Sequence, residues 1–176
     1  MHKHDVRLLY VDHGDSNSDS EVEFAVNFAS QHSLQIEIFP RKKSDLKGKS
    51  KEHVWSQARH EIFNSQTDPV VTAHHLNDVI ETWIVSSLQG KPKIMNAENV
   101  NVIRPFLLNS KQKFLDYAKR HRIEWCEDLT NSDSTFAQRN YVRNVLMPHA
   151  LVVNPGLEKT IKKLVEAEYS QNNNVQ

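Results

Sequence analysis

The stretch that decides the fold of this chain is V-T-A-H-H-L-N-D-V-I-E-T, from Val71 to Thr82. It predicts the end of a buried strand followed directly by a helix. Apolar residues recur along this helix at helical spacing and form one stripe: Leu76, Val79, Ile80, Trp83, Ile84 and Leu88. Asp78, Glu81 and Thr82 lie three and four residues apart, so they share a different face. The pattern predicts a helix that packs with one side and presents two carboxylates and a hydroxyl with the other.

The acidic pair has two interpretations, and the sequence leaves both open. Two carboxylates in the first turns of a helix suit Mg2+ binding or general acid–base catalysis. Acidic residues are also common there because they complement the positive end of any helix. His74 and His75 precede Asp78, but no cysteine or third histidine stands at ligand spacing, which disfavours zinc.

The composition is that of a globular chain. The 176 residues are 38% hydrophobic and 25% charged, which suits one domain or one domain with a small appendage. No apolar run is long enough to cross a bilayer, and the first residues form no apolar signal region. We therefore expect a cytoplasmic protein without a membrane partner. The single cysteine, Cys126, excludes an internal disulfide.

Positive charge gathers in one segment, although the formal net charge of the chain is zero. Arg41–Lys51 contains six basic residues and one acidic residue. The net charge lacks the global signature of a nucleic-acid binder, but a local basic segment can follow a phosphate backbone. A solvated lysine-rich loop explains the segment equally well, and the sequence does not decide between the two.

Strands alternate with helices along the chain, which predicts βαβ units and a parallel sheet with flanking helices. The expected strands are Val6–Val11, Leu34–Phe39, Pro69–Ala73 and Asn99–Ile103. The expected helices cover Ser18–Ala29, Lys51–Ser65, Leu76–Gln89, Ser110–Arg122, Thr135–Met147 before Pro148, and a last stretch from Pro155 to the polar tail. The sequence thus predicts an α/β domain over residues 1–108, a helical extension over 109–170 and a flexible tail over 171–176.

Two polar segments follow expected strands. Asp12-His13-Gly14 comes after the first strand, and His74-His75 comes after the third. Ligands of parallel sheets bind beyond the carboxyl ends of the strands, so the two segments together predict a binding site. Taken alone, Asp12-His13-Gly14 is typical of a plain turn.

A pair of arginines stands out further along the chain. Arg139 and Arg143 are four residues apart and share one helical face. Such a pair can grip phosphate groups bidentately. It can equally form salt bridges with the acidic residues Glu127, Asp128 or Asp133. Both interpretations stay open.

These segments together resemble the tRNA(Ile)-lysidine synthetase family of PP-loop (N-type) ATP pyrophosphatases. The matching motifs occur in the family's order: V-D-H-G at 11–14 with S-D-S-E at 18–21, A-R-H-E-I-F at 58–63, A-H-H-L-N-D-V-I-E-T at 73–82, I-R-P-F-L at 103–107, E-D-L-T-N at 127–131 and R-N-Y-V-R-N at 139–144. Asn77 stands where the family has an aspartate. The last two motifs make the resemblance specific, because the acidic helix alone is shared with other PP-loop enzymes.

The resemblance implies an adenine nucleotide alpha-hydrolase-like fold and a two-step reaction with ATP and Mg2+. ATP adenylates the C2 oxygen of the wobble cytidine of a tRNA, and the amine of L-lysine then displaces AMP. By motif match, Asp78 and Glu81 would hold Mg2+ or act in the acid–base steps, with His74 and Thr82 in support. Contacts with phosphate or tRNA would come from Arg104, Arg139, Asn140 and Arg143. Contacts with the nucleotide would come from Asp12, His13, Gly14 and His75.

The family's first strand and its S-G-G-x-D-S phosphate loop do not occur in these 176 residues. The expected fold is therefore incomplete at its first strand, and Val6–Val11 and Pro69–Ala73 would have unpaired backbone edges. One hypothesis is that a separate chain carries the S-G-G-x-D-S loop. A second is a catalytically inactive relative that binds tRNA or a protein, and a third is a truncated reading frame.

Overall fold

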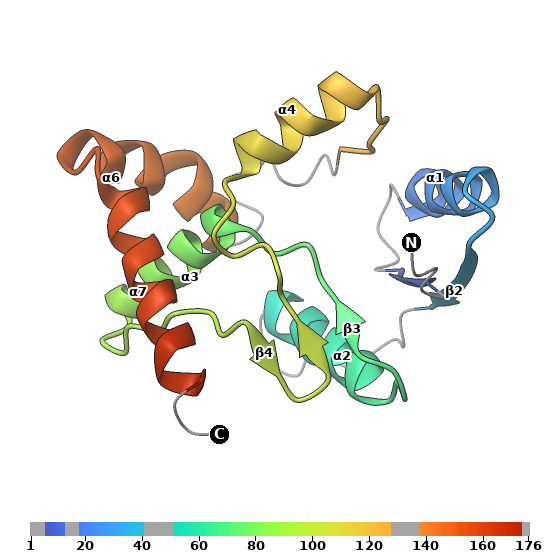
Figure 1. Ribbon diagram of the computed structural model, residues 1–176, viewed down its shortest axis with the longest axis horizontal. Helices are drawn as coiled ribbons and strands as arrows, with labels where there is room; N and C mark the ends of the chain where they lie inside the picture. Colours follow the sequence, from blue (N-terminus) through green and yellow to red (C-terminus); the bar gives the residue numbers. More distant parts are fainter. Residues whose placement is uncertain (1–5, 13–17, 41–50, 128–137, 174–176) are drawn as a thin grey trace. The chain divides into compact units, whose positions relative to one another are not determined.

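The computed structural model describes residues 6–12, 18–40, 51–127 and 138–173. The chain divides into two compact units (Figure 1). The first unit comprises Met1–Ser65 with Cys126–Asp128, and the second comprises Gln66–Trp125 with Leu129–Gln176. The sequence predicted a domain boundary after residue 108 instead, and that boundary stays a prediction. His13, Gly14, the basic residues 41–50 and most of the E-D-L-T-N motif lie outside the described residues.

The first unit is built on a parallel pair of strands, β1 (Arg7–Val11) and β2 (Gln35–Phe39). The two strands are paired from Arg7 with Gln35 to Val11 with Phe39. Helix α1 (Ser18–Gln31) connects them and packs on both, and α2 (Lys51–Asn64) follows. The hydroxyl of Tyr10 donates to Glu21 at 2.9 Å and so ties α1 to β1. All four predicted elements of this unit are confirmed.

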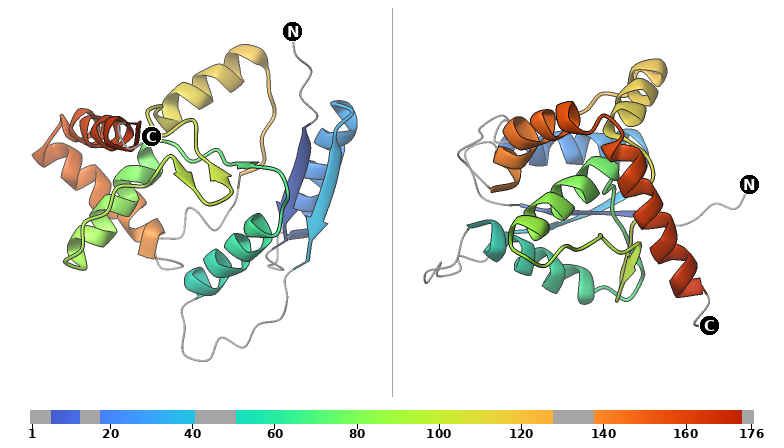
Figure 2. Two further views of the ribbon diagram at one scale, coloured as in Figure 1. Left: turned by 60° about the horizontal axis from the view of Figure 1, so that its bottom comes forward. Right: turned by 90° about the vertical axis from the view of Figure 1, so that its left-hand side faces the viewer.

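The second unit combines a small sheet with a helical layer. Its elements are β3 (Val70–Val71), α3 (Leu76–Leu88), β4 (Glu98–Asn99), β5 (Val102–Ile103), α4 (Lys111–His121), α5 (Gln138–Tyr141), a π-helical turn (Val142–Leu146), α6 (Met147–Val153) and α7 (Leu157–Asn173). The strand order is β3-β5-β4, with β3 parallel to β5 and β4 antiparallel to it. Figure 2 shows α3, α6 and α7 gathered on one side of this unit.

The core of the second unit lies where α7 crosses α3. It contains Leu76, Val79, Ile80, Ile84, Leu107, Val142, Met147, Leu157, Ile161 and Val165. Four of the six predicted stripe residues of α3 are therefore buried, and Trp83 packs against the cluster. Leu88 was expected in the stripe but is 71% exposed, because the helix ends at this residue before Gly90, whose φ is +76°.

Three predicted elements differ in the structure. The expected strand Asn99–Ile103 is a hairpin, because Val100 adopts a φ of +51° and turns the chain. The amide of Asn101 holds this turn by donating to the carbonyls of Gln66 and Asp68 at 2.9 and 3.0 Å. The strand expected over Pro69–Ala73 is shortened to Val70–Val71, since its partner β5 offers only two residues.

The third difference is at Pro148, which was expected to end a helix. Pro148 instead occupies the first turn of α6, and the helix continues to Val153. The proline is accommodated where the helical segment changes from the π-helical turn to α6. The preceding π-helical turn starts at Val142, so the helical segment changes its hydrogen-bonding pattern just before the proline.

The fold class is α/β, as expected. Both β1–β2 and β3–β5 are parallel pairs, but they belong to two separate small sheets. Within the described residues, β1 pairs only with β2, and β3 pairs only with β5, so each has one open edge. The single continuous parallel sheet stays a prediction. In the part of the chain that the structure describes, every helix is too short or too polar to span a bilayer.

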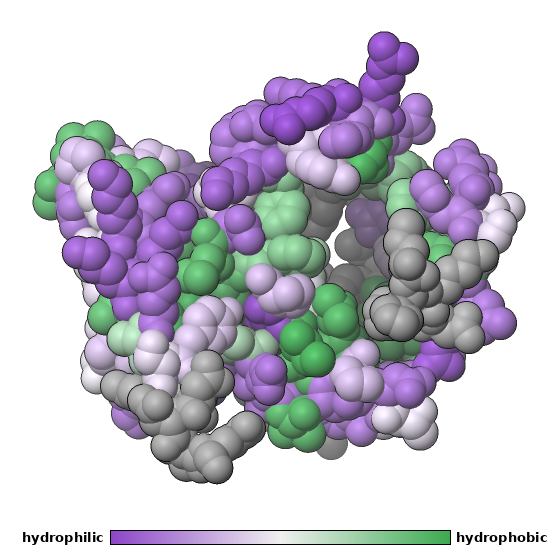
Figure 3. All heavy atoms as spheres, viewed as in Figure 1, coloured by the Kyte–Doolittle hydropathy of each residue, from purple (hydrophilic) through white to green (hydrophobic). Residues whose placement is uncertain are grey.

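Helix α4 is a polar helix of the second unit. None of its residues is buried, and Figure 3 shows a hydrophilic surface over it. Its last residue precedes Arg122, which has a φ of +52° and caps the helix in the left-handed conformation. The predicted helix Ser110–Arg122 is thereby confirmed to within one residue at each end.

Candidate functional site

The candidate site is built at the start of α3, just beyond the end of β3. His75 is the N-cap residue, and its backbone N–H donates to the carboxylate of Asp78 at 2.8 Å. The ring Nδ1 of His75 in turn accepts from the N–H of Asp78 at 3.4 Å, which completes a reciprocal cap. The carboxylate of Asp78 is therefore fixed at the positive end of the helix.

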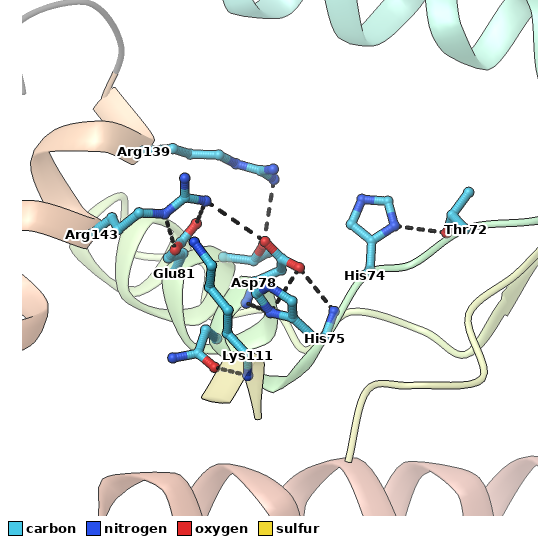
Figure 4. A network of polar contacts seen from close by, with 10 residues as sticks. Thr72, His74, His75, Asp78, Glu81, Lys111, Arg139 and Arg143 are labelled. Carbon is cyan, nitrogen blue, oxygen red and sulfur yellow. Dashed lines mark hydrogen bonds and ion pairs between the residues drawn. The ribbon is translucent and has the colours of Figure 1, made fainter. Parts of the chain in front are cut away.

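The neighbouring His74 has a different role from that of His75. Its Nδ1 lies 2.7 Å from the hydroxyl of Thr72, so this hydrogen bond fixes the orientation of the ring. Figure 4 shows the two histidine rings pointing in different directions. The two rings therefore have different partners, Thr72 for His74 and Asp78 for His75.

Glu81 forms the central contact of the site. Its two carboxylate oxygens accept from Nε and Nη2 of Arg143 at 2.7 and 3.0 Å. Glu81 is only 1% exposed. The carboxylate oxygen Oδ1 of Asp78 lies farther from Arg143, 3.8 Å from its Nη2. A buried carboxylate requires such a bidentate partner, because an unpaired charge there would be strongly destabilising.

Arg139 completes the junction between the two helical segments. Its Nη2 lies 3.4 Å from the hydroxyl of Thr82 on α3. The arginine pair therefore meets the acidic face of α3, although 62 residues separate Glu81 from Arg143 in sequence. Neither interpretation of the arginine pair from the sequence included this contact.

One expectation about the acidic face is wrong. The sequence predicted that α3 presents both carboxylates away from its packed side, but Glu81 is buried. Glu81 is buried because the helical segment 138–146 covers the acidic face of α3 and places Arg143 against its carboxylate. A single-helix pattern cannot indicate a second helix that covers the polar side.

The sequence also missed a link between α3 and α4. The side-chain oxygen of Asn77 accepts from the backbone N–H of Lys111, the first residue of α4, at 2.8 Å. Ser110, the N-cap residue of α4, makes no side-chain cap bond, so Asn77 takes over that function. The ring of Phe114 lies between His75 and Phe106, with centroid distances of 6.3 and 5.3 Å.

Comparison with known proteins identifies the family. Residues 1–150 match the PP-loop domain. The chain belongs to the PP-loop family. Among its similar relatives, a protein of Persephonella marina is 28% identical over 91% of this chain and 38% of its own length. A protein of Thermosipho africanus is 31% identical over 89% of this chain and 39% of its own length.

The names of these relatives agree with the resemblance seen in the motifs. Both are tRNA(Ile)-lysidine synthases, as is a relative from Exiguobacterium sibiricum that is 27% identical over 96% of this chain. The resemblance is therefore confirmed. The PP-loop chain spans about two fifths of the length of these relatives, with 38%, 43% and 39% covered.

In this PP-loop chain, the acidic pair as arranged does not fit a magnesium ion. Both oxygens of Glu81 accept from Arg143. Within the described ranges, no group of three or more His, Cys, Asp or Glu side chains could hold a metal. Magnesium needs carboxylate oxygens that are free to enter an octahedral shell with water and phosphate oxygens. The metal role of Asp78 and Glu81 stays a prediction, and it requires Arg143 to leave Glu81.

Cations outnumber carboxylates at this site. Figure 4 shows the side chain of Lys111 extending from the start of α4 toward the carboxylates, where Arg139 and Arg143 already lie. Among the described residues the ammonium of Lys111 has no ion-pair partner within 4.0 Å. Three cations around Asp78 and Glu81 favour an anionic ligand, such as a phosphate group, over a bare metal ion.

Three further predicted site residues lie within the described part of the chain: Arg104, Asn140 and Asp12. Arg104 is 8% exposed, and its Nη1 donates to the carbonyl of Asn96 at 3.1 Å. Burial lowers the pKa of this guanidinium from its usual value. Asn140 is buried on α5 next to Arg139. Asp12 belongs to the first unit, where its N–H donates to the carbonyl of Phe39 at 3.0 Å.

Proposed function

We propose that this chain is the part of a tRNA(Ile)-lysidine synthase that contains the acidic helix α3. In the proposed reaction, the C2 oxygen of the wobble cytidine attacks the α-phosphate of ATP, and pyrophosphate leaves. The amine of lysine then attacks C2, the bond from C2 to the adenylate oxygen breaks, and AMP leaves as the amine loses a proton. The names of the relatives and the PP-loop match support this proposal. The expected location is the cytoplasm, where tRNA, ATP and lysine are available together.

The observation that carries the proposal is the bidentate contact between Arg143 and Glu81. It joins the acidic-helix motif, A-H-H-L-N-D-V-I-E-T, to R-N-Y-V-R-N, one of the two motifs that made the resemblance specific. A chance resemblance in either motif would not require their charged residues to be complementary in space. The contact therefore supports a shared catalytic site over two unrelated surface segments.

The proposed roles follow from the charges and positions of the side chains. Arg139, Arg143 and Lys111 neutralise the negative charge that grows on pyrophosphate and on AMP as they leave. Glu81 holds Arg143 in its bidentate orientation, so it acts as a positioning residue. The side chain of Asp78 is half-buried, with 16% of it exposed, and we assign it the proton that the attacking amine loses.

ATP also needs donors for its β- and γ-phosphates, and no S-G-G-x-D-S loop occurs in these 176 residues. We propose that a segment outside these residues supplies that loop, in the same polypeptide or in a separate chain. The open edges of β1 and β3 offer backbone groups for an additional strand.

The test measures both half-reactions. The 176-residue chain is mixed with ATP, lysine and an unmodified tRNA(Ile) transcript, with and without a fragment that contains the S-G-G-x-D-S loop of a relative. We expect release of pyrophosphate and incorporation of radiolabelled lysine only in the complemented mixture. Arg143→Lys keeps the charge but loses the bidentate fork, so we expect turnover to fall by about 10²- to 10³-fold.

A matched control removes a lysine that plays no part in the site. Lys163→Gln on α7 changes an exposed residue, and we expect its turnover to equal that of the unaltered chain. If the complemented mixture consumes no ATP in the presence of tRNA and lysine, the proposal fails. Tight tRNA binding without pyrophosphate release would instead identify the non-catalytic tRNA-binding relative.

A further inference from the structure

Helix α4 concentrates positive charge in a chain of zero formal net charge. From residue 111 to residue 122 the sequence contains five basic residues: Lys111, Lys113, Lys119, Arg120 and Arg122. The one acidic residue among them, Asp116, accepts a hydrogen bond from Gln112 at 2.8 Å. By contrast, α7 has three lysines and three glutamates from Glu158 to Glu168. The charge of α4 is therefore not the general pattern of exposed helices in this chain.

The positive charge of α4 lies on its outer side together with an aromatic ring. Phe114, Leu115 and Ala118 are the half-buried residues of the helix, whereas the others are exposed. Lys113, Tyr117 and Arg120 recur at spacings of four and three residues and so form one row. We call this row, together with Lys119 beside it, the cationic face of α4.

Tyr117 is an available stacking surface within the cationic face. It is 55% exposed, although its ring packs against His121 with a centroid distance of 4.2 Å. The packing with His121 supports one side of the ring and leaves much of the side chain in solvent. An aromatic ring held this way between cations is typical of proteins that bind unpaired bases and the phosphates beside them.

The cationic face and the acidic site both lie in the second unit. The hydrogen bond from Lys111 N–H to Asn77 joins the first residue of α4 to the first turn of α3. Phe114 packs on the same side, near His75. From Lys113 to Arg120 the cationic face covers about 10 Å along the helix axis, beginning two residues after this junction.

We propose that the cationic face of α4 binds a single-stranded RNA loop whose neighbouring nucleotide enters the acidic site. Lys113, Lys119 and Arg120 contact successive backbone phosphates, and Tyr117 stacks on one unpaired base. The inference rests on the proposed function and adds to it the surface that holds the RNA. Chemistry on a base requires a nucleotide that is out of its stack, so the flanking nucleotides need such a surface.

Charge complementarity and the orientation of the helix favour RNA over a membrane surface. A helix that lies in a membrane interface directs its apolar side outward into the lipid. The apolar residues of α4 lie on its inner side, where Phe114 packs against Phe106. Its outer side has only Tyr117 as an aromatic residue, and the rest of that side is polar or charged.

The test compares two triple variants of the full 176-residue chain. One variant replaces Lys113, Lys119 and Arg120 of α4 with Gln, and the matched control replaces Lys159, Lys162 and Lys163 of α7 with Gln. Binding of a fluorescein-labelled RNA stem-loop is measured by anisotropy over a range of salt concentrations without ATP. Each lost phosphate contact should make the slope of log K against log salt shallower by about 0.7. For the α4 variant, which loses three contacts, we therefore expect a slope shallower by about 2. The control keeps the slope of the unaltered chain.

A second variant separates stacking from charge. Tyr117→Ala should weaken binding about tenfold at every salt concentration without changing the slope, and Tyr117→Phe should retain the affinity. Equal slopes for both triple variants would overturn the inference. So would equal affinity for a fully paired RNA duplex, or stronger binding to vesicles of anionic lipid than to the stem-loop.

The binding measurement does not depend on catalysis. If the chain binds the stem-loop through α4 but the complemented mixture forms no pyrophosphate, the proposed reaction fails and the RNA surface stands. If the α4 variant instead shows the KM for tRNA of the unaltered chain in the complemented reaction, the RNA surface fails and the proposed reaction stands.

Discussion

The two units of this chain use the same local structure but differ in what they bury. Each contains a parallel strand pair and a helix that follows a strand. The first unit has the longer pair, with 5 residues in each strand, whereas β3 and β5 have 2 residues each. Yet of the 13 buried hydrophobic residues described, 12 belong to the second unit, and Ala29 is the exception.

This difference shows that strand length does not decide where the stable part of the molecule lies. Backbone hydrogen bonds contribute little net free energy, whereas each fully buried aliphatic side chain contributes about 1.5–3 kcal/mol. The second unit gains this contribution from helices that cross one another. The acidic site stands on that platform, and a rigid platform is what a precisely placed ion pair needs.

The largest expected effect compares the same substitution in both units. Ile161→Ala removes a fully buried side chain from the core under α3, so we expect a loss of about 2–5 kcal/mol. Ile36→Ala in β2 removes a half-buried side chain and should cost less than about 1.5 kcal/mol. Native-state hydrogen exchange followed by mass spectrometry measures the loss separately in peptides of α3, α7, α1 and β2.

Whether the two units have separate cores is decided by which backbone amides lose protection from hydrogen exchange. Ile161→Ala should lower the protection of α3 and α7 and leave that of α1 and β2 unchanged. Equal loss in all four elements would mean that the two units unfold as one cooperative body. The comparison of separate cores would then be wrong.

The second prediction concerns the ion pair at the site. Arg143→Met leaves the carboxylate of Glu81 buried without its partner, which should cost about 3 kcal/mol in the free energy of unfolding. Adding Glu81→Gln to Arg143→Met removes the stranded charge and should restore at least half of that loss. Urea denaturation of the two single variants and the double variant measures the coupling. If the loss in the double variant equals the sum of the losses in the two single variants, Arg143 and Glu81 are not coupled, and the ion pair does not hold the site together.

The sequence predicted most of the secondary structure because its patterns are local. The stripe Leu76–Ile84, the breaker Gly90 and the alternation in Leu34–Phe39 each act within a few residues. The hairpin at Val100 was missed because a valine with positive φ has no turn signature of its own. What stabilises that turn is Asn101, which bonds to carbonyls more than thirty residues earlier.

The site was predictable in its residues but not in its contacts. Motif resemblance selected Asp78, Glu81, Thr82, Arg139 and Arg143, and the structure brings these five together. The burial of Glu81 was not predictable, since it depends on a helical segment about sixty residues later. The role of Asn77 was hidden for the same reason: the resemblance marked it as a lost aspartate, whereas the structure uses it to cap α4.

The third prediction tests that cap and so the unity of the second unit. Asn77→Ala removes the acceptor for Lys111 N–H and should cost about 1 kcal/mol. Asn77→Asp keeps an acceptor oxygen and should stay within about 0.5 kcal/mol of the unaltered chain. Thermal unfolding measures both variants, and hydrogen exchange in the first turn of α4 should accelerate only for Asn77→Ala. If both variants exchange like the unaltered chain, α4 is held by Phe114 rather than by Asn77.

The smallest expected effect is a titration that reports on the packing of α7. Burial, together with the nearby carboxylate of Glu98, raises the pKa of Tyr169 above its ordinary value. The folded state therefore binds the phenolic proton more tightly than the unfolded state, whose pKa is about 10. This contribution to stability is complete below pH 10 and is lost as the pH rises through the folded-state pKa.

Absorbance titration of the phenolate groups should accordingly show a late step from one of the four tyrosines. Tyr169→Phe should remove that step, Tyr117→Phe should retain it, and Glu98→Gln should move it to lower pH by removing the smaller of its two causes. The step belongs to the second unit, where α7 packs over α3. Ile161→Ala loosens that packing, so in this variant the late step should move toward the pH of an exposed tyrosine. If it does not move, the burial of Tyr169 does not depend on the core under α3, and the second unit is less cooperative than its buried residues indicate.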